Sequence, residues 1–474
     1  MPTKVIHAYR NSAYGPPLVN QKYAPLEDIS FTGDKDDTCD AFLTRRWDLL
    51  AGMGLLPQPL RLIMPSWEEA IAAEDDTKPP LVVISTNRSN WIKNGIEAGN
   101  VQLKHLKVTQ FDSASDLKAL TALTGQTQSP PIYAPTRIGA VDERNVYVLV
   151  HALEYDTYQT NLAGTGIKVV GWSFQPPRRR SIPLCGFGPS RYAAIEFCKY
   201  LRTQAGEPWD YAWLFDDNVV ALGPFAGYQK VEAAMAAGAT TIACAGFHGG
   251  TVPLTPGEIK AWAAKEVKAG RGKQTSKLET SKPPGLIQQA SLWNIAYLTE
   301  KKLNFGPIFI QSGEDVSIGN YFDVEGTTYL YYEGVTIRKE NYTDDNSEGA
   351  KALKKARQKL TAVITKMERL EAPAPFITPP PPIKIKPSIK TGDPVADDLE
   401  QTMARFVAKS VLPNALDDIK IKATEPATRN TAWCQATEQT ICKAIKLGFV
   451  SDTAKKLTFK INDDKTQDIV QVDK

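Results

Sequence analysis

The segment Tyr211-Ala-Trp-Leu-Phe-Asp-Asp-Asn-Val-Val220 indicates the fold class of this chain. Five apolar residues run directly into Asp216 and Asp217, and apolar residues resume after Asn218. Such a run is typical of a buried parallel strand that helices cover on both faces. Ligands of open parallel sheets bind at the carboxyl ends of the strands. The aspartates are therefore either a ligand site, suited to Mg²⁺ or Mn²⁺, or a simple Asp-Asp-Asn turn.

The surrounding pattern alternates between short apolar runs and segments with helical spacing. Strands are expected at residues 81–84, 131–137, 147–150, 167–170 and 240–245, and helices at residues 41–50, 67–73, 190–202 and 228–237. Strands separated by helices predict an α/β fold with a largely parallel sheet. Residues 270–284 are polar, basic and contain prolines, which predicts a mobile loop.

Changes in composition divide the chain into four predicted regions. Residues 1–128 form an N-terminal region without a defined role, and residues 129–345 form the α/β domain. Residues 346–390 contain a basic helix, Lys351–Leu370, and a proline-rich linker. Residues 391–474 are expected to form a small, mostly helical C-terminal domain.

The overall composition is that of a soluble globular protein. The chain has 474 residues, 42% hydrophobic and 23% charged, with a formal net charge of +3. That charge does not demand a nucleic-acid partner, so nucleic acid would have to meet a local basic patch. No signal core or bilayer-spanning segment is present, the six cysteines are scattered, and we expect a cytoplasmic protein with no membrane contact. The sequence predicts no protein partner.

Four polar features in the α/β region carry the candidate chemistry. Thr136 and Arg137 follow a predicted strand, where the arginine suits a base or phosphate or else pairs on the surface with Asp142 or Glu143. Gly186–Arg191 forms a glycine-containing turn that opens a helix, which favours anion binding. Asp216–Asn218 offers metal ligands. Glu314 and Asp315 offer a general base.

The order of these features resembles the glycosyltransferases of GT-A fold, whose metal motif is Asp-x-Asp at the end of a central strand. Many inverting members place a Glu-Asp pair, with the Asp as catalytic base, about a hundred residues later. Asp315 lies 99 positions after Asp216. The resemblance implies a Rossmann-type nucleotide-sugar-binding domain, a metal held by Asp216, Asp217 and Asn218, and catalysis by Asp315 beside Glu314. The segment Gln289–Leu298 looks like the acceptor-side helix.

Within this fold the chain looks most like the TET/JBP-associated glycosyltransferases. The matching residues are Pro135-Thr-Arg137, Val148-Leu-Val150, Glu154-Tyr155, Tyr158, Arg191, Leu214–Val219 and Gly313-Glu-Asp315. The resemblance covers residues 131–340. It implies transfer of a sugar from a nucleotide sugar, expected to be a UDP-sugar, to a hydroxymethylated pyrimidine in phage DNA, inside the bacterial host cytoplasm. Thr136, Arg137, Arg191 and Asp216 would contact the donor.

One position departs from the family pattern, because Asn218 stands where the metal motif ends in Asp. Either Asp217 is the main ligand, or the metal binds weakly, or none is needed. His248 is a further candidate metal ligand or substrate contact, or else structural. Three alternatives stay open: a GT-A enzyme with another acceptor, a catalytically degenerate nucleic-acid-binding module, and a nucleotidyltransferase. Basic candidates for DNA contact, or else solvated faces, are Arg178–Arg180, the loop with Arg271, Lys273, Lys277 and Lys282, and the Lys351–Arg369 helix.

Overall fold

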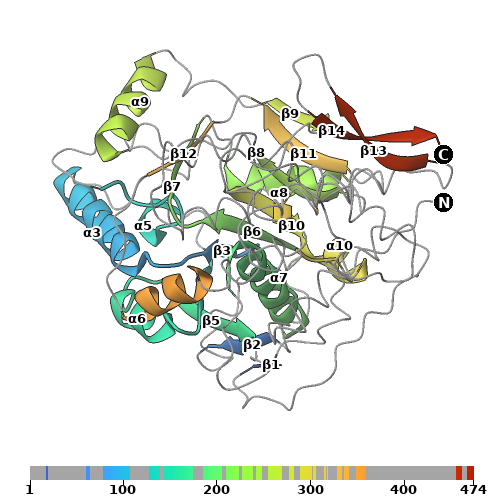
Figure 1. Ribbon diagram of the computed structural model, residues 1–474. Coiled ribbons are helices and arrows are strands. Elements are labelled where there is room, and N and C mark those ends of the chain that lie inside the picture. Colours follow the sequence, from blue (N-terminus) through green and yellow to red (C-terminus); the bar gives the residue numbers. More distant parts are fainter. Residues whose placement is uncertain are drawn as a thin grey trace, which may run out of the picture.

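A mixed α/β architecture surrounds one ten-stranded sheet in the computed structural model (Figure 1). The structure describes residues 18–19, 60–64, 78–106, 128–138, 144–174, 185–204, 210–223, 227–238, 242–247, 255–268, 277–281, 289–301, 303–305, 314–315, 318, 328–333, 336–340, 348–358, 455–461 and 467–473.

The strands of the main sheet follow the order β1-β2-β5-β4-β3-β6-β10-β8-β11-β9. Their bounds are Leu18–Val19 (β1), Leu60–Ile63 (β2), Leu81–Ile84 (β3), Val146–His151 (β4), Lys168–Phe174 (β5), Tyr211–Asp216 (β6), Ile242–Phe247 (β8), Lys277–Ser281 (β9), Ala290–Asn294 (β10) and Thr328–Glu333 (β11). From β5 to β11 the strands are parallel except β10, which is antiparallel to both β6 and β8.

The path of the chain through the central strands creates a reversal point. The chain lays down β3, then β4 and β5 outward on one side, and returns to place β6 on the other side of β3. In register, Ile84 at the end of β3 lies opposite Asp216 at the end of β6. Open α/β sheets bind ligands in the crevice outside such a reversal, at the carboxyl ends of the two strands.

Helices cover both faces of this sheet, which explains why central strands such as β3 and β8 are continuously apolar. The helices are α3 (Ser89–Leu106), α5 (Pro135–Ile138), α6 (Tyr155–Asn161), α7 (Phe187–Gln204), α8 (Tyr228–Ala237), α9 (Pro256–Lys268), α10 (Ile295–Glu300) and an unlabelled helix over residues 348–358, orange in Figure 1. Tyr228 of α8 packs on Trp213, with ring centroids 5.1 Å apart. Phe197 of α7 packs on Tyr147, at 5.0 Å, on the opposite face.

Most of the expected elements are confirmed. β3, β4, β5, β6 and β8 form where apolar runs predicted strands, and α7 and α8 where the spacing predicted helices. The predicted helices at residues 41–50 and 67–73 lie outside the described residues. Gly186, with φ of 134°, forms the turn just before α7, as expected of a glycine at that position.

Other expected elements differ from the structure. The predicted strand at residues 131–137 is a turn followed by α5, where Pro135 takes the first helical position. The expected acceptor-side helix Gln289–Leu298 begins instead as β10, and its helical part is α10, capped by Asn294. Part of the expected loop 270–284 pairs with β11 as β9.

Two of the predicted regions contain strands that the prediction did not place there. β3 belongs to the region assigned to residues 1–128, yet it is a central strand of the main sheet, so residue 128 does not separate two folding units. The C-terminal region, expected to be mostly helical, contains a hairpin of β13 (Lys455–Ile461) and β14 (Gln467–Asp473) in its described part. β7 (Val219–Gly223) and β12 (Thr336–Lys339) form a second small antiparallel sheet.

Two expectations about the whole chain have structural counterparts. None of the helices in the described ranges is long and apolar enough to cross a membrane. Cys198 and Cys244, expected to be buried thiols, are buried and unpaired by disulfides, as is Cys185.

Candidate functional site

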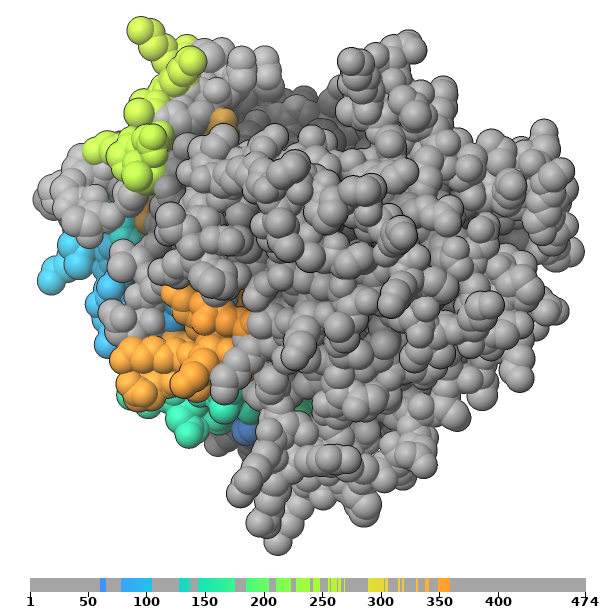
Figure 2. Space-filling model, viewed as in Figure 1, coloured from blue at the N-terminus to red at the C-terminus, as the bar shows by residue number. Residues whose placement is uncertain are grey.

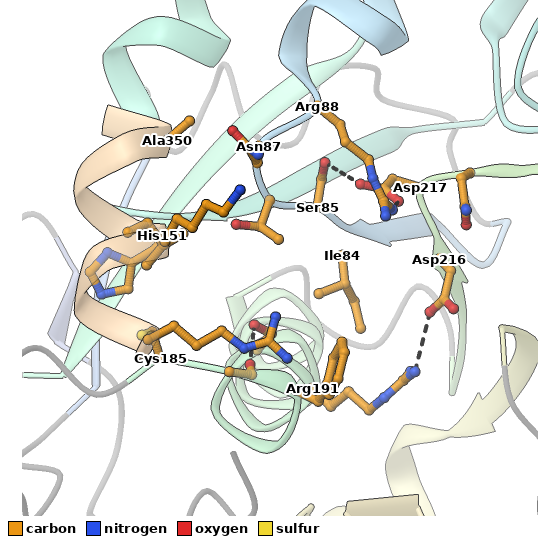
Figure 3. Close-up of a pocket in the computed structure, with 18 of the residues that line it drawn as sticks. Ile84, Ser85, Asn87, Arg88, His151, Cys185, Arg191, Asp216, Asp217 and Ala350 are labelled. Carbon is orange, nitrogen blue, oxygen red and sulfur yellow. Dashed lines mark hydrogen bonds and ion pairs between the residues drawn. The ribbon is translucent and has the colours of Figure 1, made fainter. Parts of the chain in front are cut away.

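A pocket of about 420 Å³ opens at the carboxyl ends of β3 and β6, at the reversal point of the sheet (Figure 3). Most of its wall comes from four segments far apart in sequence: residues 84–88 at the end of β3, residues 185–191 at the start of α7, residues 216–218 at the end of β6, and the helix over residues 348–358. His151, Trp172 and Lys339 complete the lining. Figure 3 shows Asp216 and Asp217 on one side of the pocket and the helix over residues 348–358, which carries Ala350, on the other.

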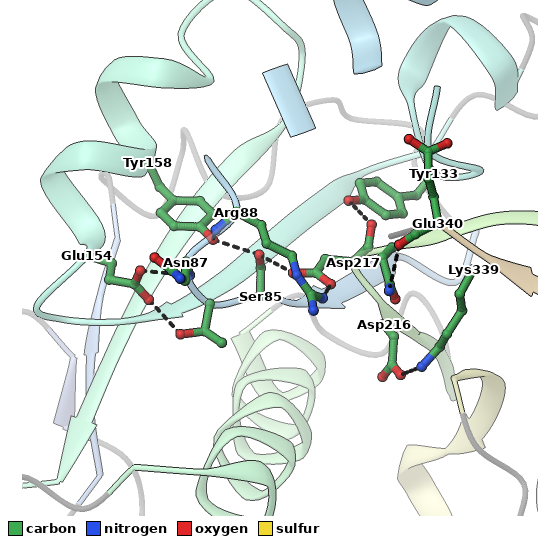
Figure 4. Close-up of polar contacts among 12 residues, drawn as sticks. Ser85, Asn87, Arg88, Tyr133, Glu154, Tyr158, Asp216, Asp217, Lys339 and Glu340 are labelled. Carbon is green, nitrogen blue, oxygen red and sulfur yellow. Dashed lines mark hydrogen bonds and ion pairs between the residues drawn. The ribbon is translucent and has the colours of Figure 1, made fainter. Parts of the chain in front are cut away.

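Asp217 is held in a buried polar network beneath the pocket (Figure 4). Its carboxylate accepts hydrogen bonds from Ser85 Oγ at 2.6 Å and from the guanidinium of Arg88. Tyr158 Oη lies 2.7 Å from Ser85 Oγ, and Tyr133 Oη donates to the Asp217 carbonyl at 2.7 Å. Burial raises the pKa of Asp217 more than Arg88 and Ser85 lower it. This aspartate therefore ties β3, α6 and the turn after β6 together.

Asp216 lies at the pocket wall and is paired with two cations. Lys339 Nζ lies 2.7 Å from its Oδ2, and Arg191 Nη2 lies 3.2 Å from its Oδ1. Burial opposes ionisation of this carboxyl, but Lys339 and Arg191 outweigh it and lower the pKa of Asp216 to about 2. Asp216 is thus a carboxylate at neutral pH, and it fixes two cationic side chains at the pocket.

Arg191 also links Asp216 to the predicted catalytic pair. Its Nε lies 3.0 Å from Glu314 Oε1, and its guanidinium lies over the ring of Phe305, 5.9 Å from the centroid. Burial raises the pKa of Glu314 to about 7, and the charge of Asp315 makes the second-largest contribution to this increase. Asp315 is more exposed than Glu314, which is buried, and its charge acts on both Glu314 and Arg191. The structure therefore gathers Arg191, Asp216, Glu314 and Asp315, as the sequence predicted.

The oxygens expected to hold a divalent metal have protein partners. Both carboxylate oxygens of Asp216 and both of Asp217 accept hydrogen bonds or ion pairs from side chains. Asn218 donates through Nδ2 to the Glu340 carbonyl at 3.2 Å, and its buried Oδ1 has no hydrogen-bond partner. Within the described residues, no group of three His, Cys, Asp or Glu side chains could hold a metal. His248 lies outside the described residues. These residues do not fit a Mn²⁺ or Mg²⁺ site.

Arg137, expected to contact the donor or else to pair on the surface, lies in the interior of the protein, and Asp142 and Glu143 are outside the described residues. The Arg137 side chain is fully buried, and Nη1 donates to the carbonyls of Pro130 at 2.7 Å and Val220 at 2.6 Å. It is not among the described residues that line the pocket. Thr136 shares the short helix α5, and its side chain lies outside the described structure. The structure therefore assigns Arg137 to the packing between the 128–138 segment and β7.

Several pocket residues were not selected from the sequence. Ser85 and Arg88 follow the apolar run of β3 as Asp216 follows that of β6, so the same strand-then-polar pattern identifies them. Lys339 follows the weak strand β12, which carries no comparable signal. Lys354 and Arg357 belong to the helix predicted from residue 351, but nothing in its sequence shows that this helix packs on a pocket.

Comparison with known proteins adds no identification: no protein-family model matches the chain, and no curated protein sequence is significantly similar to it. Arguments about function therefore depend on the geometry of the pocket.

We expect Arg137→Met to destabilise the fold without weakening ligand binding. The change leaves two buried carbonyls without this donor, at a cost of about 1–3 kcal/mol each. Urea denaturation measures the loss, and calorimetry of the folded variant measures its affinity for nucleoside diphosphates. Arg202→Met serves as the control, because Arg202 pairs with the exposed Asp210 and such pairs contribute about 0–1 kcal/mol. Weaker ligand binding at unchanged stability would return Arg137 to the ligand site.

Proposed function

We propose that the protein is a nucleotide-sugar-dependent glycosyltransferase of the GT-A type. The observation that carries this proposal is a cationic pocket at the reversal point of a parallel sheet, with a carboxylate pair adjoining it. Rossmann-like sheets bind nucleotides at this location. The expected donor is a UDP-sugar, whose anionic diphosphate requires a positively charged environment.

The charges lining the pocket favour an anion of this kind. Five cationic side chains and two carboxylates face it. Guanidinium groups suit phosphates because their planar donor fork matches two phosphate oxygens at once. The cations are Arg88, Arg191, Lys339, Lys354 and Arg357, and the carboxylates are Asp216 and Asp217.

The carboxylates beside Arg191 suit a single displacement. In the proposed reaction Asp315 accepts the proton of the acceptor hydroxyl, whose oxygen bonds to the anomeric carbon of the sugar. The bond from that carbon to the diphosphate breaks, and the nucleoside diphosphate leaves with its electron pair. Attack opposite the leaving group inverts the anomeric centre. Glu314, buried and bound to Arg191, holds the arginine in place.

The proposed acceptor is a hydroxymethylated pyrimidine in DNA, on the strength of the family resemblance. A base inside a duplex has to be flipped out, or presented in a single strand, before its hydroxyl can reach an enclosed site. Contacts to the phosphate backbone would make binding weaken steeply as salt is added.

A mass-spectrometric transfer assay tests this proposal. The protein is incubated with UDP-, GDP- and ADP-sugars and with DNA that contains 5-hydroxymethylcytosine or 5-hydroxymethyluracil, and matched unmodified DNA is the control. We expect one sugar added to each modified base and none to unmodified DNA. Release of free sugar without transfer would support the glycosyltransferase assignment and would show that these bases are not the acceptor. The absence of both sugar transfer and donor hydrolysis would overturn the proposed function.

A further inference from the structure

The wall of the pocket next to β6 is built so that Asp216 presents cations to the ligand. Lys339 comes from β12 and Arg191 from near the start of α7, and both converge on this one carboxylate. Their side chains keep 15% and 12% of their surface exposed, and both line the pocket. Arg191 is fixed from a second side by Glu314. Asp216 therefore positions two cations, although its place in the sequence suggests a metal ligand.

The opposite wall adds further positive charge from the helix over residues 348–358. Lys354 and Arg357 line the pocket there, and the guanidinium of Arg357 lies 4.4 Å from the ring centroid of Phe187 in α7. This helix reaches the surface of the molecule in Figure 2, where it is orange. Its first turn packs closely on the turn after β4, because a Cβ at Gly349 would collide with the Leu153 carbonyl. The cations of this wall are thus on an anchored element.

We propose that this site neutralises the diphosphate of its ligand with protein cations, chiefly Lys339 and Arg191 and then Lys354 and Arg357, and that binding requires no divalent metal. This inference depends on the proposed function, whose family pattern would place a metal at the same residues. A metal there would have to displace Lys339 and Arg191 from Asp216, and Arg88 and Ser85 from Asp217. Lysine and arginine instead reach phosphate oxygens directly, with charge-assisted hydrogen bonds.

Calorimetry with inorganic pyrophosphate tests the inference without knowledge of the base or sugar. The titration is done once in EDTA and once with MnCl₂ in excess of pyrophosphate. We expect binding in EDTA that Mn²⁺ does not tighten. In parallel, the electron paramagnetic resonance signal of free Mn²⁺ should not decrease when the protein alone is added. Binding that appears only with Mn²⁺, or no binding under either condition, would overturn the inference.

Variants locate the site and separate the two roles of Asp216. Lys339→Met should weaken pyrophosphate binding in EDTA by about 10-fold or more, since a hydrogen bond to a charged group contributes about 1.5–3 kcal/mol. Lys354→Met, on the other wall, should also weaken it. Lys351→Met is the matched control, because Lys351 lies on the same helix, is largely exposed and pairs with Glu348. An unchanged affinity in both pocket variants would contradict the inference.

Asp216→Asn distinguishes an anchor for cations from a metal ligand. If the residue is an anchor, asparagine keeps one oxygen acceptor for Lys339 and Arg191 and removes the negative charge that repels pyrophosphate, so binding in EDTA should stay intact or become tighter. As a metal ligand, it should be required for binding that depends on Mn²⁺. The transfer assay is independent of these results: metal-dependent binding together with sugar transfer would overturn this inference alone, whereas metal-free pyrophosphate binding without any donor hydrolysis or transfer would overturn the proposed function alone.

Discussion

Replacement of Asp315 by Asn is expected to reduce turnover by about 10²–10⁴-fold, the usual contribution of a general base. The donor should still bind, because the pocket cations are unchanged and Asp315 is not among the described residues that line the pocket. The measurement is kcat and the KM for the nucleotide sugar, with calorimetry of the nucleoside diphosphate as an independent check on binding. A fall in kcat with little change in KM would assign Asp315 to the chemical step.

Glu314→Gln is the matched control for this prediction. Glu314 is the neighbouring carboxylate, but it is buried and its Oε1 accepts from Arg191 Nε. Glutamine keeps an acceptor there and removes only the charge, so the effect should fall mainly on donor affinity through Arg191. A larger loss of kcat in Glu314→Gln than in Asp315→Asn would transfer the base role to Glu314.

The fold was predictable from the sequence to the extent that burial follows a simple pattern. β4 and β8 are buried along their whole length, so their residues form continuous apolar runs that a parallel sheet requires. β10 is also buried throughout, yet Ala290-Ser-Leu-Trp-Asn294 contains polar residues and leads directly into α10. Its strand identity comes from pairing with β6 and β8, which are distant in sequence and leave no local signal.

The candidate site was predictable in part for a related reason. Arg191, Asp216, Glu314 and Asp315 were selected by residue type and spacing, and the structure gathers them. Arg137 was selected by the same criteria, but residue type does not reveal whether an arginine faces a ligand or two buried carbonyls. The partners of Asp216 were also hidden, because Lys339 lies 123 positions away in sequence.

Replacement of Arg88 by Met is expected to destabilise the protein by about 3–5 kcal/mol, because it leaves a buried charge on Asp217 without its cation. The side chain of Asp217 is 2% exposed, and Ser85 is its remaining side-chain donor among the described hydrogen bonds. Urea denaturation at pH 7 measures the change. Lys93→Met is the control, since Lys93 and Glu97 form an exposed i,i+4 pair whose loss should cost about 0.3–0.5 kcal/mol.

The double variant Arg88→Met/Asp217→Asn should recover much of this loss, because the buried charge is removed together with its partner. A coupling free energy of about 1–3 kcal/mol is expected for groups in direct contact.

The pH dependence follows from the raised pKa of Asp217: the folded state holds the proton more tightly than the unfolded state, in which the pKa is near 3.8. Stability linked to this group is therefore complete below that value and is lost as pH rises through the folded pKa. In Arg88→Met the folded pKa should rise further, so the deficit relative to the parent should shrink from pH 7 toward pH 5. A deficit that is independent of pH, or additive losses in the double variant, would mean that Arg88 stabilises this region by packing rather than by neutralising Asp217.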